Sequence, residues 1–427
     1  MRDSKARPLA RWLTFAAVLI FSAGLAFAGA RHAIAEHWAG SSDPNQWLRA
    51  AELEPSNAEN WDRLGRYRYL DSANQNLPLA ITYFKRATAI DPGSAAYWSD
   101  LAEAYETAGQ IAPAEAAYER AQRDYPISAE VAWQYGNFLL RDGRVPEAFA
   151  EIHRTLSADP TLTPLAVSLC WRSTHDVDQI LKFALPASGD IYWRAVDFFV
   201  GSREPAAAMA VWKQLSSDRI SSPLPKVFPL LDLLIGLNDT DDAQAIWLQA
   251  LSSAGVMPQS SPGTLIWDGG FEQNLLNGGF AWRYQPVEGA DIGLDEQTMH
   301  SGSRSLRVSF DGTSNVDFQN IWQYVAVKPN TRYRFGAYVQ SEDLTTDSGI
   351  RFEIDPTGMP PQLTPNVTGT QPWALNDLEF STGPQTHQLR VLLRRTPSQR
   401  LGNKIRGIAW VDDVSLIQIP GAALTLR

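Results

Sequence analysis

The most constraining feature of this sequence is a proline that recurs at nearly equal intervals. Pro55, Pro92, Pro126 and Pro160 stand 37, 34 and 34 residues apart, and each closes a similar segment. Large apolar residues come early in each segment, and small ones lie in its middle. A period of 34 residues with this pattern is typical of a helix–turn–helix unit that stacks on copies of itself. Such a stack offers a long binding surface rather than an enclosed catalytic pocket.

The helical spacing is clearest in the copy at 95–128. Its first half carries apolar residues at i, i+3, i+4 and i+7, one face of a helix, namely Trp98, Leu101, Ala102 and Tyr105. Its second half carries a matching stripe of three small residues and one aromatic residue, namely Ala114, Ala117, Ala121 and Tyr118. Gly109 separates the two predicted helices, and Pro126 ends the second.

Two further copies, around 61–92 and 135–160, keep the same register. Taken together, the copies resemble the tetratricopeptide repeat. We therefore expect an all-α superhelical array of these repeats over 45–160. Degenerate helical pairs are expected over 161–255, where Trp212 and Trp247 lie 35 residues apart.

The resemblance also implies a partner site. In this family, ligands lie along the concave face lined by the first helix of each repeat. By register, that face carries aromatic, acidic and amide side chains, namely Tyr69, Glu103, Glu106, Trp133 and Asn137. These residues would suit an amphipathic or basic segment of a protein partner. The alternative is a solvated inner surface.

The N-terminus predicts export. A basic segment at 1–11 precedes an uncharged stretch at 12–30, which is long enough to cross a bilayer as a helix. The basic flank should stay in the cytoplasm. Everything after a linker at 31–44 would then lie in the periplasm or another extracytoplasmic space, anchored to the inner membrane by a single pass. The alternative is a cleaved signal peptide, because Ala26-Phe27-Ala28 has the form of a cleavage site, and the protein would then be secreted.

The second half of the chain has a different pattern of apolar and polar residues. Helical patterning stops at a linker over 256–263, which is rich in Ser, Gly and Pro. From 264 to 420 short segments alternate between apolar and polar residues, as in 305–310, 322–327 and 332–339. Such alternation with turn residues between the segments is typical of an all-β sandwich. Residues 421–427 are a tail.

Four segments of this region, taken in order, resemble jelly-roll carbohydrate-binding modules with a galactose-binding-like sandwich. They are 269–272 (GGFE), 300–308 (HSGSRSLRV), 323–333 (QYVAVKPNTRY) and 410–416 (WVDDVSL). The resemblance implies glycan binding. It also implies a structural calcium, whose ligands here would be Glu272, Asp413 and Asp412. The alternative is that these acids lie in turns or pair with basic side chains.

Candidate glycan contacts are of two kinds. Aromatic rings can stack on the C–H faces of sugars, and the candidates are Trp282, Trp322, Tyr338 and Trp373. Each of them could equally belong to the core. Arg390, Arg394 and Arg395 open a basic run, up to Arg406, that contains no acidic residue and could bind an acidic polysaccharide. The alternative is that these arginines pair with the many acids of the domain.

Other classes of function find little support. The formal net charge of −10 argues against nucleic-acid binding. The six histidines show no metal-ligand spacing, and the single Cys170 cannot form an internal disulfide. Glu353 and Asp355 resemble part of a jelly-roll glycosidase motif, but the position for its third acid is Gly358. We therefore expect no enzyme activity.

The sequence thus predicts an exported, membrane-anchored adaptor. Its repeats would bind a protein partner and its sandwich a glycan, in exopolysaccharide or cell-envelope assembly. The alternative is a protein–protein scaffold whose sandwich does not bind sugar. A glycoside hydrolase is a weaker third reading.

Overall fold

The computed structural model describes residues 6–217, 223–256 and 263–419, with the side chains of 6–11 left out. Most of the predicted linker at 256–263, the tail at 421–427 and part of the basic segment at 1–11 lie outside these residues. The chain divides into two compact units, residues 1–194 and 195–427. Each unit is described by itself.

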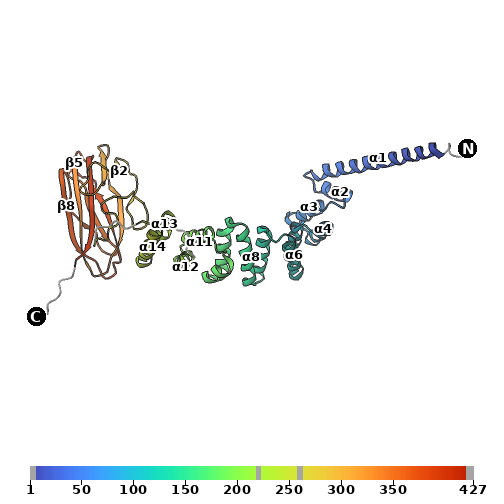
Figure 1. Cartoon of the computed structure of the whole chain (residues 1–427), viewed down its shortest axis with the longest axis horizontal. Helices are drawn as coiled ribbons and strands as arrows, with labels where there is room; N and C mark the ends of the chain where they lie inside the picture. Colours follow the sequence, from blue (N-terminus) through green and yellow to red (C-terminus); the bar gives the residue numbers. More distant parts are fainter. Residues whose placement is uncertain (1–5, 218–222, 257–262, 420–427) are drawn as a thin grey trace. The chain divides into compact units, whose positions relative to one another are not determined.

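The first unit begins with a single long helix, α1 (Ala6–Ala39), drawn in dark blue in Figure 1. Its segment Trp12–Ala39 contains an 18-residue stretch with a mean hydropathy of 2.1, and it is long and apolar enough to be a membrane span or a signal sequence. The helix continues through much of the predicted linker at 31–44, because 31–39 is alanine-rich and the next breaker is Gly40.

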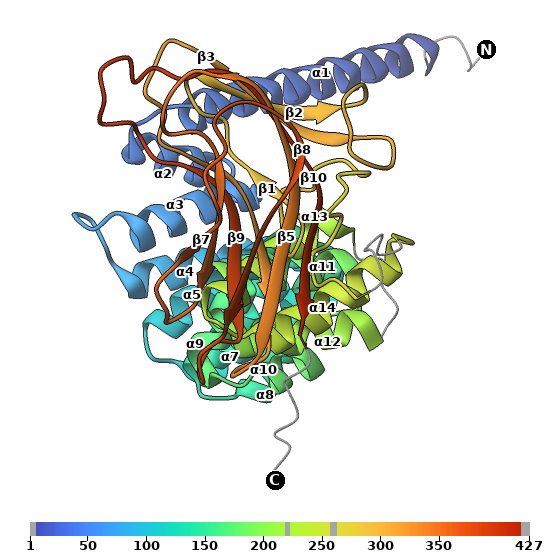
Figure 2. The same cartoon turned by 90° about the vertical axis from the view of Figure 1, so that its left-hand side faces the viewer.

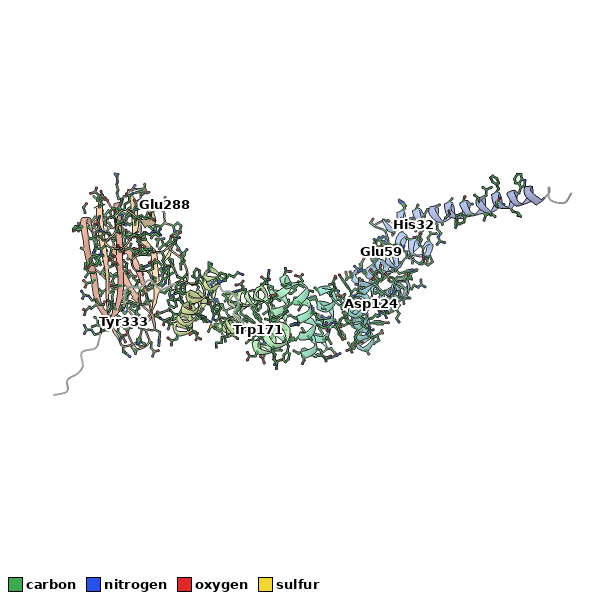
Figure 3. All side chains as sticks on the ribbon, viewed as in Figure 1. His32, Glu59, Asp124, Trp171, Glu288 and Tyr333 are labelled. Atoms are coloured by element: carbon green, nitrogen blue, oxygen red, sulfur yellow. The ribbon has the colours of Figure 1, made fainter. Side chains whose placement is uncertain are left out.

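The end of α1 packs on the array rather than hanging free. Ala35 is buried, and the ring of His32, labelled in Figure 3, lies with its Nδ1 2.9 Å from Glu54 Oε1. The guanidinium of Arg63 also donates to the Ala39 carbonyl at the end of the helix. The apolar helix therefore joins the repeats through a packed segment.

Pairs of antiparallel helices follow, as the period of the prolines predicts. The helices up to residue 158 are α2 (Pro44–Leu53), α3 (Ala58–Leu70), α4 (Leu77–Ile90), α5 (Ala95–Thr107), α6 (Ile111–Asp124), α7 (Ala129–Arg141) and α8 (Val145–Ala158). Each copy identified in the sequence forms one pair, α3–α4, α5–α6 or α7–α8. The first unit continues with η1 (Pro160–Leu162), α9 (Thr163–Thr174), α10 (Val177–Gln179) and η2 (Ile180–Ala184), and it ends within α11 (Gly189–Gly201). The helix α12 (Pro205–Ser217) belongs to the second unit.

The repeated Pro and Trp are joined by a hydrogen bond. Trp61 Nε1 donates to the carbonyl of Pro55 at 3.1 Å, and Trp98 Nε1 donates to that of Pro92 at 2.9 Å. Each bond ties the start of a repeat to the end of the preceding one and contributes about 1 kcal/mol. Ser94 and Ser128 cap the first helices of their repeats.

The second unit contains a β-sandwich, drawn in yellow to red in Figure 1. One antiparallel sheet, here called sheet A, has the order β2-β3-β10-β5-β8, and sheet B has the order β1-β4-β9-β6-β7. Figure 2 shows β8, β5 and β10 of sheet A beside one another. The strands are β1 (Arg283–Tyr284), β2 (Ala290–Asp295), β3 (Ser305–Asp311), β4 (Phe318–Ala326), β5 (Arg332–Leu344), β6 (Arg351–Pro356), β7 (Gln362–Leu363), β8 (Gly369–Ser381), β9 (Gln388–Arg395) and β10 (Arg406–Gln418). A helical array followed by a double antiparallel sheet confirms the predicted fold class.

Alternate residues of both sheets fill one core. The inward residues of β3 are Leu306, Val308 and Phe310, and those of β9 are Leu389, Val391 and Leu393. The sheets therefore meet through the faces that the apolar alternation predicts. The residues between them point away from the core, and these outward faces are where ligands could bind.

A helix pair packs directly on sheet B. α13 (Leu224–Gly236) and α14 (Thr240–Ser253) belong to the same compact unit as the sandwich. The Trp247 ring of α14 lies 5.9 Å from the Trp267 ring and 6.5 Å from the Phe280 ring, measured between centroids. On α13, Asp232 accepts a hydrogen bond from Arg283 of β1. The region predicted as degenerate repeats thus ends in a pair that is part of the sandwich unit.

Gln388 of β9 completes this contact. Its Nε2 donates to the Ile235 carbonyl at 3.0 Å, and Thr240 Oγ1 donates to its Oε1 at 3.3 Å. One buried amide thereby satisfies the end of α13 and the start of α14. The two helix ends are held at a fixed place on the sheet.

The contact predicts an unequal cost for two glycine substitutions. Gly279 has φ +56°, and an added Cβ would lie 2.8 Å from the Trp247 ring; Gly402 has φ +77° with nothing within 4 Å. Both Gly279→Ala and Gly402→Ala incur backbone strain, but only the first also overpacks the contact. We expect Gly279→Ala to lower the free energy of unfolding by about 1–3 kcal/mol more than Gly402→Ala. Denaturant titration followed by tryptophan fluorescence measures both; equal losses would contradict the docking of the helix pair.

Candidate functional site

The outward face of sheet A carries a continuous band of polar and aromatic side chains. Arg307 of β3, Trp410 of β10 and Gln340 of β5 lie opposite one another across three strands. In the neighbouring row, Tyr338 lies opposite Leu375 of β8. Trp410 is nearly buried and its Nε1 donates to Asp295 Oδ2 at 2.8 Å, whereas the others are part-exposed or exposed.

Three rings gather at one place on this face. The imidazole of His300 stacks on Tyr338 with centroids 3.6 Å apart and planes 13° from parallel. Trp373 of β8 lies edge-on to His300 at 5.7 Å. Tyr338 and Trp373 were both candidate glycan contacts, and the structure brings them together around His300. We call His300, Tyr338 and Trp373 the aromatic cluster.

The His300 ring is held by two neighbouring carboxylates. A β-bulge in β10 shifts the register between Asp412 and Ser415, and Asp413 has φ +49°. Asp412 Oδ2 accepts hydrogen bonds from the amides of His300 at 2.8 Å and Ser301 at 3.0 Å. Asp413 Oδ2 lies 2.6 Å from His300 Nδ1. The bulge therefore fixes the loop that carries the imidazole.

Glu272 holds the next residues of the same loop. Its Oε1 accepts from the Ser303 amide at 2.8 Å, and Ser303 Oγ donates to its Oε2. Gly302, with φ +64°, allows the close approach, because a Cβ there would lie 1.9 Å from Glu272 Oε1. The three residues predicted as calcium ligands thus converge on the loop 300–304.

The electrostatics of these acids differ. Burial raises the pKa of Asp412, and backbone amides oppose the rise. Slight burial acts to raise the pKa of Glu272, but the hydrogen bonds from Ser303 and Arg304 hold it below its usual range. Burial also raises the pKa of Asp268, which accepts from the Glu272 and Gln273 amides, to about 6. Glu272 is therefore the carboxylate most strongly favoured as an anion.

As arranged, the three carboxylates do not fit calcium well. The loop meets them with N–H and O–H donors, whereas Ca²⁺ requires a shell of oxygen ligands. No group of three or more His, Cys, Asp or Glu side chains suited to a metal ion occurs in the described parts of the chain. The hydrogen bonds alone can hold the loop, so it does not require the calcium that the resemblance implies.

A hollow of about 870 Å³ lies on sheet A toward the other end of the strands. Glu288 and Tyr333 mark the two ends of the sandwich in Figure 3, and the hollow lies toward the Glu288 end, where β3 stops and β10 starts. Its lining includes charged and small side chains, among them Ser309, Asp311, Glu342, Asp343, Arg406 and Ile408. The outward face of sheet A thus offers both stacked rings and an acidic hollow.

Two of the candidate glycan contacts are buried, and for them the prediction is wrong. Trp282 is 1% exposed; it stacks on Phe271 and donates to the Asp268 carbonyl. Arg395 continues the inward register of β9 and is fully buried. Its guanidinium is solvated by oxygens of three loops, including Ser348 O at 2.9 Å, and burial lowers its pKa. Neither side chain can reach a ligand.

Arg390 and Arg394 of the basic run are engaged in ion pairs. Arg390 Nη2 lies 3.1 Å from Asp355, and Arg394 pairs with Asp317 and, at 3.5 Å, with Glu353. These pairs also occupy the two acids of the incomplete glycosidase motif. The run on sheet B is therefore neutralised, and it offers no free row of cations to an acidic polysaccharide.

Trp322 lies on the outward face of sheet B, apart from the aromatic cluster. In register it stands between Arg283 and Leu392, and its Nε1 is buried without a hydrogen-bond partner in the part of the chain that the structure describes. Arg283 of the same sheet lies over the Tyr324 ring at 5.4 Å and contacts α13. Trp322 thus belongs to the sheet on which the helix pair packs.

The predicted partner-binding residues lie on α3, α5 and α7. The Tyr69 hydroxyl lies 3.0 Å from Thr107 Oγ1, and Asn137 Nδ2 donates to the Trp133 carbonyl at 2.7 Å. Arg141 binds both oxygens of Glu106, at 2.5 and 2.9 Å. Glu103 has no ion pair among the described residues, and burial, followed by the charge of Asp100, raises its pKa. Of the two predicted acids, Glu103 is the one left to attract a cation.

Sequence reasoning missed His300, Trp410 and Gln340. Gln340 follows directly on the alternating segment 332–339, so the alternation could have revealed it, and Trp410 lies opposite it on β10. His300 depends on Asp413, which lies more than a hundred residues away, and no local pattern points to that contact.

One known family matches part of the helical array. Residues 73–132 match the model of the tetratricopeptide repeat family. This match covers α4, α5, α6 and the start of α7. No curated protein matches the sequence significantly.

Among solved structures, similarity is confined to parts of the chain. MamA is 18% identical over 41% of this chain and 86% of its own, with a TM-score of 0.28. A family 16 carbohydrate-binding module is 20% identical over 36% of this chain and 99% of its own, with a TM-score of 0.26. TmCBM61, solved in complex with beta-1,4-galactotriose, is 14% identical over 36% and 99%, with a TM-score of 0.27. These likenesses are too low to carry an argument about function.

The hydrogen-bonded loop predicts the response to calcium. Because N–H and O–H donors already satisfy Glu272, Asp412 and Asp413, we expect the same unfolding temperature in excess calcium and in excess chelator. A saturated structural calcium would instead separate the two temperatures by about 5 °C or more. Differential scanning fluorimetry makes the comparison, with Glu272→Gln as a matched variant. A calcium-dependent shift that Glu272→Gln abolishes would contradict this expectation and establish the metal site.

Proposed function

We propose that the protein is a binding adaptor, in which the outward face of sheet A binds a glycan and the concave groove of the repeats binds a protein partner. The aromatic cluster supports the glycan half most directly. Flat rings of Tyr338 and Trp373 that keep part of their surface open are the groups that stack on sugar rings. Polar side chains beside them, such as Gln340 and Arg307, can bind hydroxyl groups.

The charges near the cluster favour a neutral glycan. Asp295 and, in the hollow, Glu342 and Asp343 lie on the same sheet, and they would repel a polyanion. Of the arginines first considered for this role, Arg390 and Arg394 are paired and Arg395 is buried on the other sheet. We therefore assign sheet A to an uncharged, hydroxyl-rich chain rather than to an acidic polysaccharide.

The N-terminal helix supports a place outside the cytoplasm. Its apolar segment is followed directly by the packed end of α1, so an uncleaved helix would hold the array close to the bilayer surface. The basic residues before it favour retention of the N-terminus in the cytoplasm. In this position the protein would bring a partner to a glycan during exopolysaccharide or cell-envelope assembly.

Substitution of the cluster tests the glycan half. We expect full-length protein in detergent to bind a neutral oligosaccharide on a glycan array. Trp373→Ala or Tyr338→Ala should weaken this binding about tenfold or more, because a stacked aromatic anchor is lost. Trp322→Ala, a part-exposed tryptophan on the other sheet, is the matched control and should leave binding unchanged. Calorimetry on the strongest array ligand gives the affinities.

The other outcomes separate the alternatives. No binding to any neutral or acidic glycan would favour a protein–protein scaffold with a sandwich that does not bind sugar. Loss of binding in Trp322→Ala but not in Trp373→Ala would move the site to sheet B. Turnover of a labelled glycan that Glu353→Gln abolishes would support a hydrolase.

A further inference from the structure

A small polar cavity lies in the repeat groove, beside the residues predicted to bind a partner. It has a volume of about 180 Å³ and is lined by the first helices of successive repeats. The side chains used in the argument below are Arg66, Ser99, Asp100, Glu130 and Gln134. We call this the groove cavity.

Two polar atoms of the groove cavity lack partners. Ser99 is 3% exposed, and its Oγ has no hydrogen-bond partner among the described residues. The same holds for Gln134 Oε1, whose atom is also buried. Buried polar atoms are nearly always hydrogen-bonded in folded proteins, so two unpaired oxygens in one cavity point to a missing donor.

The only cation that lines the cavity, within the described residues, is already engaged. Arg66 Nε lies 2.9 Å from Asp62 Oδ2, and Arg66 Nη2 lies 2.7 Å from Asp100 Oδ2. These contacts direct the guanidinium toward the two aspartates. Within the described residues, it makes no hydrogen bond to Ser99 Oγ or Gln134 Oε1.

The acidic charge at the rim of the groove cavity also favours a cationic ligand. Glu130, the second residue of α7, is exposed and has no ion pair in the described parts of the chain. With Asp100 it makes the cavity acidic despite Arg66. An acidic side chain would be repelled there, whereas a cation would gain both hydrogen bonds and charge neutralisation.

The volume of the groove cavity limits the size of the ligand that it can hold. Pockets for small-molecule ligands are usually about 300–1,000 Å³, and the groove cavity is smaller. It suits one extended side chain entering from a bound segment. An ammonium group has three donors around one point and no acceptor, which matches separate oxygens from Ser99, Gln134 and an acid.

We propose that the groove cavity is a recognition site for a lysine side chain of the protein partner. The inference rests on the partner-binding half of the proposed function and names the chemistry that this half recognises. A lysine would donate to Ser99 Oγ and Gln134 Oε1 while its charge lies near Glu130. The partner segment would run along the first helices of the repeats and insert this one side chain.

The test uses peptides selected from a random displayed library on the full-length protein in detergent. We expect the selected peptides to share a lysine, and its replacement by norleucine to weaken binding about tenfold. Ser99→Ala and Glu130→Gln should each weaken the lysine peptide by a similar factor, since each removes one contact of the ammonium. The matched control is Glu119→Gln, because Glu119 is an exposed acid on the second helix of its repeat and pairs with Arg123.

A stability measurement distinguishes recognition from folding. Ser99→Ala removes a buried hydroxyl that has no partner, so the variant without peptide should unfold at a temperature no lower than that of the original protein. Weaker peptide binding together with unchanged stability is the combination that a purely structural serine would not give.

Three results would overturn the proposal. Equal binding of the lysine and norleucine peptides would show that no ammonium is recognised. Lysine-dependent binding that Ser99→Ala and Glu130→Gln leave unchanged would place the lysine elsewhere on the array, and partner binding itself would stand. Failure to select any peptide would overturn both this inference and the partner-binding half of the proposed function, but not the glycan half.

Discussion

The packing of Trp247 against the sandwich determines which of its faces is available. The ring lies among Trp267, Phe280 and Phe228, and glycines at 278 and 279 leave the space that it and Phe228 occupy. Around this apolar centre, Arg283 pairs with Asp232, and Gln388 binds both helix ends. A contact with a ring at its centre and the hydrogen-bonded side chains of Arg283 and Gln388 at its edge resembles a domain interior more than a loose junction.

This contact gives the two sheets different roles. Sheet B supports the helix pair along β1 and β4. Its Arg390 and Arg394 are paired with acids of β6. Sheet A instead has a loop fixed by Asp412, Asp413 and Glu272, which places His300 over Tyr338. The ring cluster is therefore preorganised before any ligand arrives, which lowers the entropy lost on binding.

The fold is largely predictable from the sequence, because the repeat period determines the helix pairs and the apolar alternation determines the strands. The recurring Pro and Trp are joined by a hydrogen bond at two repeat boundaries, and the strands follow the apolar alternation. The same alternation, read one step further along β9, would have placed Arg395 inside the core with Leu393. The alternation shows which face of the sheet a residue occupies. Arg395 was expected at the surface because it is charged, although its position in the alternation is inward.

The site was harder to predict because its members meet only through tertiary contacts. Tyr338 and Trp373 were chosen for their residue type, but nothing near them in sequence indicates His300, and nothing near Trp282 indicates that Phe271 and Asp268 cover it. In the groove cavity, Ser99 stands out only because its hydroxyl is buried without a partner among the residues that the structure describes. Burial and hydrogen-bond satisfaction are properties of the fold, which no single segment contains.

Oxidative footprinting of the tryptophans, with and without a bound neutral oligosaccharide, tests the central claim most directly. Without ligand, the account predicts that Trp373 is labelled readily, while Trp247 and Trp267, covered by the helix pair, are protected. With ligand, the labelling of Trp373 should fall and that of Trp322 should stay the same. Ready labelling of Trp247 and Trp267 in the free protein, or ligand protection of Trp322 in place of Trp373, would contradict it.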